Sequence, residues 1–295
     1  MTILQLIEPE IKNLGESFAR RSLPYPNRQM VGPFIFFDHL GPSVMPPNQG
    51  IDVRPHPHIN LATVTYLFDG ALMHRDSLGT VQEIQPGAVN WMTAGKGIVH
   101  SERSPDHDRY NEAIIHGIQT WVALPVEHEE TEPNFIHYPA ETLPTWEENG
   151  ALIKLIAGKT LGYASPVKVF SPILYLAAVL SANAHFTIPT DYSERAVYSV
   201  TEGLRINDEP IEQYRLAILQ PGEQIKVSAT ASAQCIVIGG EPLGTRYKWW
   251  NFVSSRPERI EQAKADWRDC RFASVPDETE FIPLPEVVTE ANPFS

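Results

Sequence analysis

The chain has 295 residues, 42% of them hydrophobic, and a formal net charge of −13 from 23 basic and 36 acidic residues. The length predicts two domains, and the acidic excess disfavours direct binding to nucleic acid or to an anionic membrane, because both depend on basic side chains. No early segment has the pattern of a signal peptide, no apolar run approaches the roughly 18 residues of a membrane span, and Cys235 and Cys270 form no Cys-x-x-Cys pair, so we expect a cytoplasmic protein.

The first half of the sequence alternates short apolar runs with turns rich in glycine and proline. This rhythm is typical of an all-β jelly roll. Turns are indicated, for example, at Asp69-Gly70 and at Gln85-Pro86-Gly87. The predicted strands cover residues 32–40, 50–58, 61–68, 71–76, 81–84, 88–93, 97–102 and 114–124.

Two of these strands carry pairs of metal-ligand side chains. Residues two apart on a strand point to the same face, so His56 and His58 project together, as do His100 and Glu102. If the two strands are neighbours in a barrel, the four side chains can converge on one metal ion. The alternative is that they are hydrogen-bonded residues of a polar barrel lining, which is weakened because four crowded ionisable groups would be costly without a cation.

The other histidines of the first half are interpreted without a metal. Adjacent Asp38 and His39 face opposite sides of a strand, so they are no catalytic pair and His39 is interpreted as structural. His74, beside a turn in charged company, is interpreted as a surface residue. His107 is expected in a solvated loop, and His116 is interpreted as a hydrogen-bonded residue of the protein interior rather than a fifth ligand.

Residues 125–144 interrupt the strand rhythm and are interpreted as the connection between two barrels. Their acidic run is expected to be solvated; it comprises Glu127, Glu129, Glu130 and Glu132. We predict a metal-binding barrel over residues 1–130 and a second barrel over 131–295 that binds no metal. His185, the one histidine after residue 150, has no partner two residues on, and no His-x-Glu occurs after Glu102. Its predicted strands are 151–156, 173–180, 185–188, 196–200, 216–219, 224–227 and 234–238.

A helix is predicted after residue 254. Ser255 to Glu258 has the pattern of a capping box with proline in the first turn, and Ile260, Ala263 and Trp267 follow at helical spacing. An aromatic cluster at residues 247–252 precedes the helix, and we expect it to pack. The predicted fold is therefore all-β, with two tandem jelly-roll barrels and a short C-terminal helix.

The chain resembles the pirin family, whose members are two-barrel proteins (bicupins) of the cupin superfamily. The resemblance lies in residues 54–58, 63–67, 91–98 and 100–102, with further matches at 32–42 and 240–243. It implies that His56, His58, His100 and Glu102 bind the metal. One departure is Ala62, at a position where cupins often carry a glutamate; because the pirin carboxylate ligand comes from the second motif, this loss should not abolish binding.

The resemblance implies one divalent transition metal ion, with Fe(II) favoured and Mn, Ni, Co, Cu or Zn as alternatives. Bacterial pirins resemble quercetin 2,3-dioxygenases, which implies a small aromatic, flavonol-like substrate and O2, with Glu102 as the catalytic proton acceptor. Arg54 and Asn60 are candidates to support the ligands. The alternative is a non-enzymatic, iron-dependent regulatory protein that binds a protein partner. We expect a monomer in either case.

Overall fold

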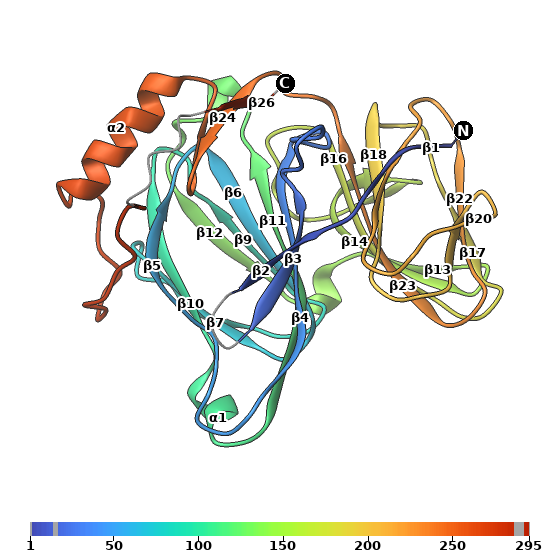
Figure 1. Ribbon diagram of the computed structural model, residues 1–295, viewed down its shortest axis with the longest axis horizontal. Coiled ribbons are helices and arrows are strands. Elements are labelled where there is room, and N and C mark those ends of the chain that lie inside the picture. The colour runs from blue at the N-terminus through green and yellow to red at the C-terminus, as the bar shows by residue number, and fades with distance from the viewer. Residues whose placement is uncertain (1, 14–16, 286–291, 295) are drawn as a thin grey trace. The chain divides into compact units, whose positions relative to one another are not determined.

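The computed structural model describes residues 2–13, 17–285 and 292–294 (Figure 1). These residues form two compact units. The first comprises Ile11–Ala19, Phe37–Ala140 and Leu243–Ser295, contains nine of the ten histidines and is called the histidine unit below. The second unit comprises Met1–Glu10, Arg20–Phe36 and Glu141–Pro242. The predicted all-β class, with two barrels and a short C-terminal helix, is confirmed.

Two antiparallel sheets build the barrel of the histidine unit. Valine, isoleucine, threonine and aromatic residues are frequent in its central strands, such as Thr63 to Tyr66, and these residue types favour β structure. The larger sheet has the order β12-β9-β6-β11-β4-β3-β2, and the smaller one β5-β10-β7-β8. The strands are β2 Glu10–Asn13, β3 Phe18–Leu23, β4 Phe34–Met45, β5 Asp52–His58, β6 Leu61–Asp69, β7 Leu72–Asp76, β8 Val81–Ile84, β9 Val89–Thr93, β10 Ile98–Arg103, β11 Ala113–Ala123 and β12 Asn134–Tyr138.

The stretch at residues 125–144 is more ordered than predicted. It contains β12, which pairs with β9 as an edge strand of the larger sheet, and two short 3-10 helices, Val126–His128 and Ala140–Thr142. Its acidic run is not uniformly solvated, because the Glu129 side chain is only 2% exposed against Arg246. Burial requires a partner for a charge, and here that partner lies more than a hundred residues away.

The second unit is built on the strands predicted for the second half of the chain, and the N-terminal β1 joins its larger sheet. That sheet has the order β1-β21-β18-β23-β16-β14-β13, with β15 paired to β14, and the smaller sheet the order β17-β22-β19-β20. The strands are β1 Ile3–Ile7, β13 Thr145–Glu148, β14 Ala151–Thr160, β15 Tyr163–Ala164, β16 Ile173–Leu180, β17 His185–Ile188, β18 Glu194–Ser199, β19 Leu204–Ile206, β20 Glu209–Pro210, β21 Leu216–Leu219, β22 Ile225–Ala229 and β23 Ala233–Gly240. An apolar core that includes Phe186 and Val237 fills it.

The C-terminal part of the chain returns to the histidine unit. It forms β24 Arg246–Trp249, β25 Phe252–Ser254, β26 Asn292–Phe294 and the helix α2 Pro257–Arg268. Proline stands in the first turn as predicted, and Ile260 and Ala263 are fully buried against the aromatic cluster. The prediction of a capping box is wrong. The residue before the helix is Arg256, which makes no side-chain cap, and the Ser255 hydroxyl donates to Glu129 instead.

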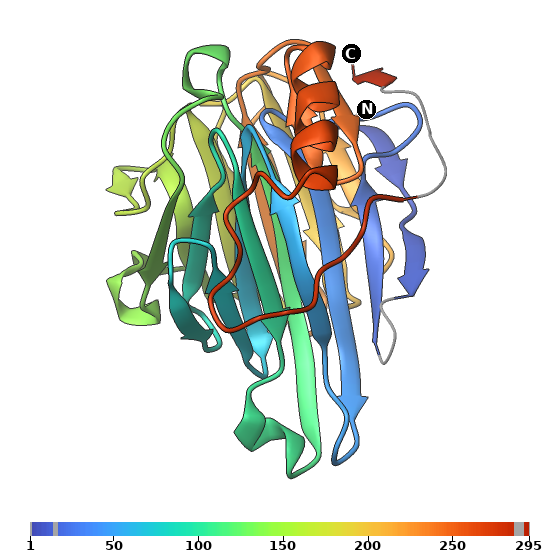
Figure 2. The ribbon, with the colours of Figure 1, turned by 90° about the vertical axis from the view of Figure 1, so that its left-hand side faces the viewer.

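After α2, residues 269–285 form a long loop that crosses in front of the strands of the histidine unit (Figure 2). The Ile282 amide donates to the Pro55 carbonyl at 2.8 Å. The Glu278 carboxylate accepts hydrogen bonds from Ser101 and Arg103. This segment therefore lies on the outer side of β5 and β10. No helix among the described residues is long and apolar enough to cross a membrane.

Candidate metal centre

Strands β5 and β10 lie side by side and are antiparallel, as the paired motifs require. His56 is directly opposite His100, and His58 is opposite Ile98. The register then shifts, so that Glu102 lies opposite Val53. Such an irregularity bends the strand and turns the side chains that follow it. The His-x-His pair and His100 thus face the same side of the smaller sheet.

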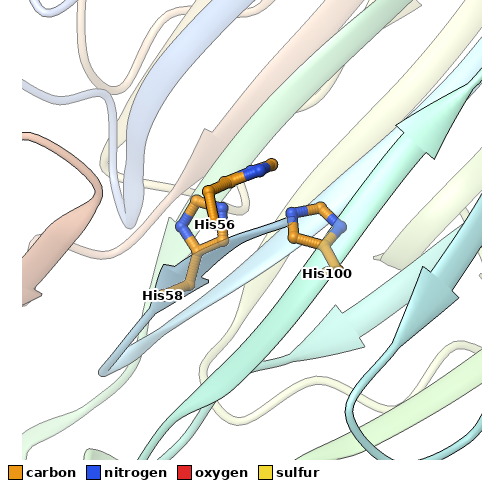
Figure 3. A group of neighbouring side chains, drawn as sticks. All are labelled: His56, His58 and His100. Carbon is orange, nitrogen blue, oxygen red and sulfur yellow. The ribbon is translucent and has the colours of Figure 1, made fainter. Parts of the chain in front are cut away.

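Three histidine side chains converge on one point (Figure 3). Their candidate ligand nitrogens all lie within 4.8 Å of one another, and the ring centroids of His56 and His100 are 4.4 Å apart. His56 is 7% exposed, and His58 and His100 are each 1% exposed. Buried polar side chains this close need a common partner or mutual hydrogen bonds, and a cation is the partner that three nitrogen lone pairs can share.

Backbone carbonyls fix the tautomer of two of these rings. His56 Nδ1 lies 2.9 Å from the Arg54 carbonyl oxygen, and His58 Nδ1 lies 3.2 Å from that of Asn251. A carbonyl can only accept, so Nδ1 carries the proton and the Nε2 lone pair is free. Nε2 of His100 is buried and has no hydrogen-bond partner among the described residues. These observations fit a metal ion held by Nε2 atoms.

The three imidazoles are also in the correct charge state. Burial lowers the pKa of His58 and of His100 well below the usual value of 6.5, and the neighbouring histidines lower both further. Burial lowers the pKa of His56 too, although the Arg54 carbonyl and Glu102 oppose the shift. Neutral imidazole is the form that binds metals, so this cluster can hold a divalent metal ion at neutral pH.

Glu102 is buried beside the cluster, with 8% of its surface exposed. Gln119 donates to both carboxylate oxygens at 2.8 Å, and Thr65 donates to one of them at 3.2 Å. Among the described residues, the group of mutually close ligand atoms consists of the three histidines without this carboxylate. Glu102 is therefore held by polar neighbours from β6 and β11, close enough to influence the charge of His56.

Two models of known domains match most of this chain: the pirin model over residues 16–122 and the pirin C-terminal cupin domain over residues 175–273. The chain belongs to the pirin family. Both the family and the bicupin fold predicted from the sequence motifs are thereby confirmed.

Individual relatives agree with the pirin assignment over nearly the whole length. A pirin-like protein of Caulobacter vibrioides is 45% identical, covering 93% of this chain and 96% of its own. Pirin of Rattus norvegicus is 31% identical over 86% and 87% of the two chains. The crystal structure of a quercetin 2,3-dioxygenase from Acinetobacter baumannii superimposes with a TM-score of 0.91 at 32% identity, covering 99% of this chain and 98% of that one.

Of the two candidates to support the pirin ligands, Arg54 contacts a ligand and Asn60 contacts a loop. Arg54 contributes its backbone carbonyl, as described above. Asn60 is fully buried, but its side-chain amide donates to the Glu129 carbonyl at 2.6 Å, so it holds a loop. Ala62 is fully buried within β6 and offers no ligand atom. His39 and His116 contact each other through Nε2 at 2.8 Å, as a separate pair.

The interpretation of His74 as a surface residue is wrong. It is only 4% exposed, its Nε2 lies 2.9 Å from Asp76 Oδ2, and its ring stacks on Phe135 with centroids 4.2 Å apart. Burial acts to raise the pKa of Asp76, but hydrogen bonds, first among them that of His74, lower it overall. His74 and Asp76 are two residues apart on one strand, so their side chains point to the same face. This spacing could have indicated the pair, but the charged residues around it suggested a surface position.

Proposed function

We propose that this chain binds one divalent transition metal ion, iron(II) in the cell, through Nε2 of His56, His58 and His100 together with the Glu102 carboxylate. The observation that supports the proposal most directly is the convergence of three neutral, buried imidazoles, one of which has an unsatisfied Nε2. An uncompensated cluster of this kind would cost several kcal/mol in desolvated polar atoms (roughly 1–3 kcal/mol for each). Three histidines and one carboxylate suit iron and its first-row neighbours.

We further propose that the site is a quercetin 2,3-dioxygenase-type centre for flavonol-like substrates and O2. A solved relative with 32% identity over almost the whole chain carries that name. The metal, when bound, would supply Lewis acidity toward a substrate hydroxyl. Glu102 would accept the proton of that hydroxyl, either as a metal ligand or after releasing the metal, and its burial beside the three histidines supports this role. Gln119 would hold the carboxylate in position, since it donates to both oxygens.

The test is a reconstitution of full-length, metal-free protein with Fe(II), Mn(II), Co(II), Ni(II) or Cu(II), each mixed with quercetin under air. We expect at least one metal to support O2 consumption together with loss of flavonol absorbance. His56→Ala should abolish both signals, because it removes a ligand. Glu102→Gln should still bind metal through the three histidines, though more weakly, and should lower kcat at saturating metal because the amide cannot accept the proton. If no metal supports turnover, the dioxygenase proposal fails and a metal-dependent binding function gains support.

A matched control separates loss of the site from loss of the fold. His107 lies on the short helix α1 (Asp106–Arg109), and its side chain is 63% exposed. His107→Ala therefore changes a histidine of the same unit without touching the cluster. It should bind metal and turn over like the wild type. Full turnover in His56→Ala would show that any activity belongs elsewhere in the protein.

A further inference from the structure

His100 differs from the other two histidines in what faces its Nδ1. Where His56 and His58 each meet a backbone carbonyl, Nδ1 of His100 lies 3.4 Å from Nδ1 of His74. The two residues come from adjacent strands, since β7 pairs with β10 and places Asp76 opposite His100. Both residues are buried: His74 is 4% exposed and His100 is 1% exposed. The third candidate ligand is thus oriented by a side chain.

The positions of the protons on His100 and His74 follow from Asp76, the last acceptor in this series of hydrogen bonds. Asp76 can only accept, so His74 Nε2 carries a proton and donates to it at 2.9 Å. In a neutral His74 ring, Nδ1 is then the acceptor, and His100 Nδ1 must be the donor. His100 is left with a lone pair on Nε2, which is the nitrogen without a partner. This is the tautomer that a metal ligand needs.

The carboxylate at the end of the chain is itself fixed. Asp76 Oδ1 accepts from the backbone amides of Leu78 at 2.9 Å and Thr80 at 3.1 Å, which leaves Oδ2 for His74. Phe135 from β12 stacks on the His74 ring with an interplanar angle of 21°. Neither ring nor carboxylate can rotate without losing these contacts, so the order of donors and acceptors is set before any metal arrives.

We propose that His74 and Asp76 are positioning residues that hold His100 in the tautomer and orientation that bind the metal. The proposal rests on the metal site proposed above and deepens it. It makes the affinity for metal depend on two side chains that provide no ligand atom. Losing such supporting partners costs about 10–100-fold in metal affinity in known metal sites.

Two substitutions test the proposal by different routes. Asp76→Asn can keep the contacts to Leu78 and Thr80 through its amide oxygen, while its NH2 group faces His74 and donates. The direction of the hydrogen bonds from Asp76 to His100 is then reversed, because His74 Nδ1 becomes a donor and His100 must carry its proton on Nε2. His74→Phe preserves the stacking on Phe135 but leaves His100 Nδ1 unpartnered. In His74→Gln, by contrast, the amide oxygen can accept from His100.

The measurement is a titration of full-length, metal-free protein with Co(II), read by d–d absorbance and by competition with a chelator. We expect stoichiometric binding to the wild type, a Kd raised about 10–100-fold in Asp76→Asn and His74→Phe, and substantial recovery in His74→Gln. The d–d spectra of the weakened variants should shift, because the ligand field at His100 changes. His107→Phe, with an exposed ring, is the matched control and should bind as the wild type does.

The outcomes separate this inference from the metal site itself. Wild-type protein that binds no Co(II) would overturn both. Wild-type binding together with Kd values within threefold in Asp76→Asn and His74→Phe would overturn only the positioning role. Circular dichroism and thermal melting of the metal-free variants establish that they are folded. If His74→Phe does not fold, the contrast between Asp76→Asn and the wild type decides the question.

Discussion

The buried ion pair between Glu129 and Arg246 offers a stability test of the histidine unit. Replacing Glu129 with glutamine removes the charge but keeps the size of the side chain. Arg246 is 1% exposed, and its Nε lies 3.2 Å from the carboxylate, in an ionic contact that is not an aligned hydrogen bond. Its terminal nitrogens donate to three carbonyls, those of Leu124, Leu243 and Thr245. In Glu129→Gln these carbonyl dipoles and the charge of Glu127 would be left to compensate the guanidinium.

The expected loss of stability follows from removing one member of a buried ion pair. An uncompensated buried charge destabilises a protein by roughly 3–5 kcal/mol. For a domain of about 150–250 residues each kcal/mol lowers Tm by roughly 2–4 °C, which gives a decrease of about 6–20 °C. The glutamine oxygen can still accept from the Ser255 amide, which lies 2.7 Å from Glu129. The Ser254 and Ser255 hydroxyls, which donate to the other carboxylate oxygen, can turn to accept from the glutamine NH2 group, so the loss should arise mainly from the charge.

Differential scanning calorimetry at pH 7 measures this effect, and a double-mutant cycle assigns it. Arg246→Met should cost about 0.5–3 kcal/mol less in the Glu129→Gln background than in the wild type, because contacting residues couple by that amount. The control is Glu132→Gln, whose side chain is 78% exposed and pairs with Lys96; it should cost below about 1 kcal/mol. Additive effects of the two substitutions at 129 and 246 would refute the reasoning.

Two further predictions concern other titratable groups. Ellman's reagent should modify one thiol per native chain, that of exposed Cys270, because Cys235 is buried and burial raises its pKa to about 12. Modification of two thiols in the native protein, or of any thiol in native Cys270→Ser, would contradict this. Burial acts to raise the pKa of Glu278, but Arg103 and its other donors lower it below 4.5. Its stabilisation is thus present above about pH 4.5 and lost as the pH falls through the lower, folded-state pKa, so the Tm difference between wild type and Glu278→Gln should shrink from pH 7 to pH 3, whereas Glu280→Gln, 60% exposed, should show little difference throughout.

The shared orientation of His56 and His58 could be predicted because it depends only on strand parity. Side chains two apart share a face whatever the rest of the fold does, so His56 and His58 were certain to project together once a strand was assumed. The short apolar runs gave β16, β17 and β21 at their observed bounds, Ile173–Leu180, His185–Ile188 and Leu216–Leu219. The pairing of β5 with β10, which brings in His100, came from the resemblance to pirins.

Contacts between distant segments could not be predicted from local pattern. The burial of Glu129 depends on Arg246, and the tautomer of His58 depends on the Asn251 carbonyl. Nothing near either residue in sequence indicates such a partner. His74 was misassigned for a related reason: its neighbours Arg75 and Asp76 look like surface charges, but on a barrel strand alternate residues face inward and outward, and the inward Asp76 is fully buried.

The histidine cluster thus draws its orientation from three places in the chain, each acting on a different Nδ1. His56 uses a carbonyl of its own strand, His58 one from the segment before α2, and His100 the His74 ring on the neighbouring strand. Strand parity sends the alternate residues Val99 and Ser101 of β10 to the opposite face, where Glu278 accepts from Ser101. We therefore expect substitutions on that outer face to leave all three orienting contacts intact. The C-terminal segment therefore has two separable effects on this barrel: residue 251 bears on the geometry of a candidate ligand, and residues 278–282 on the stability of the strands that carry it.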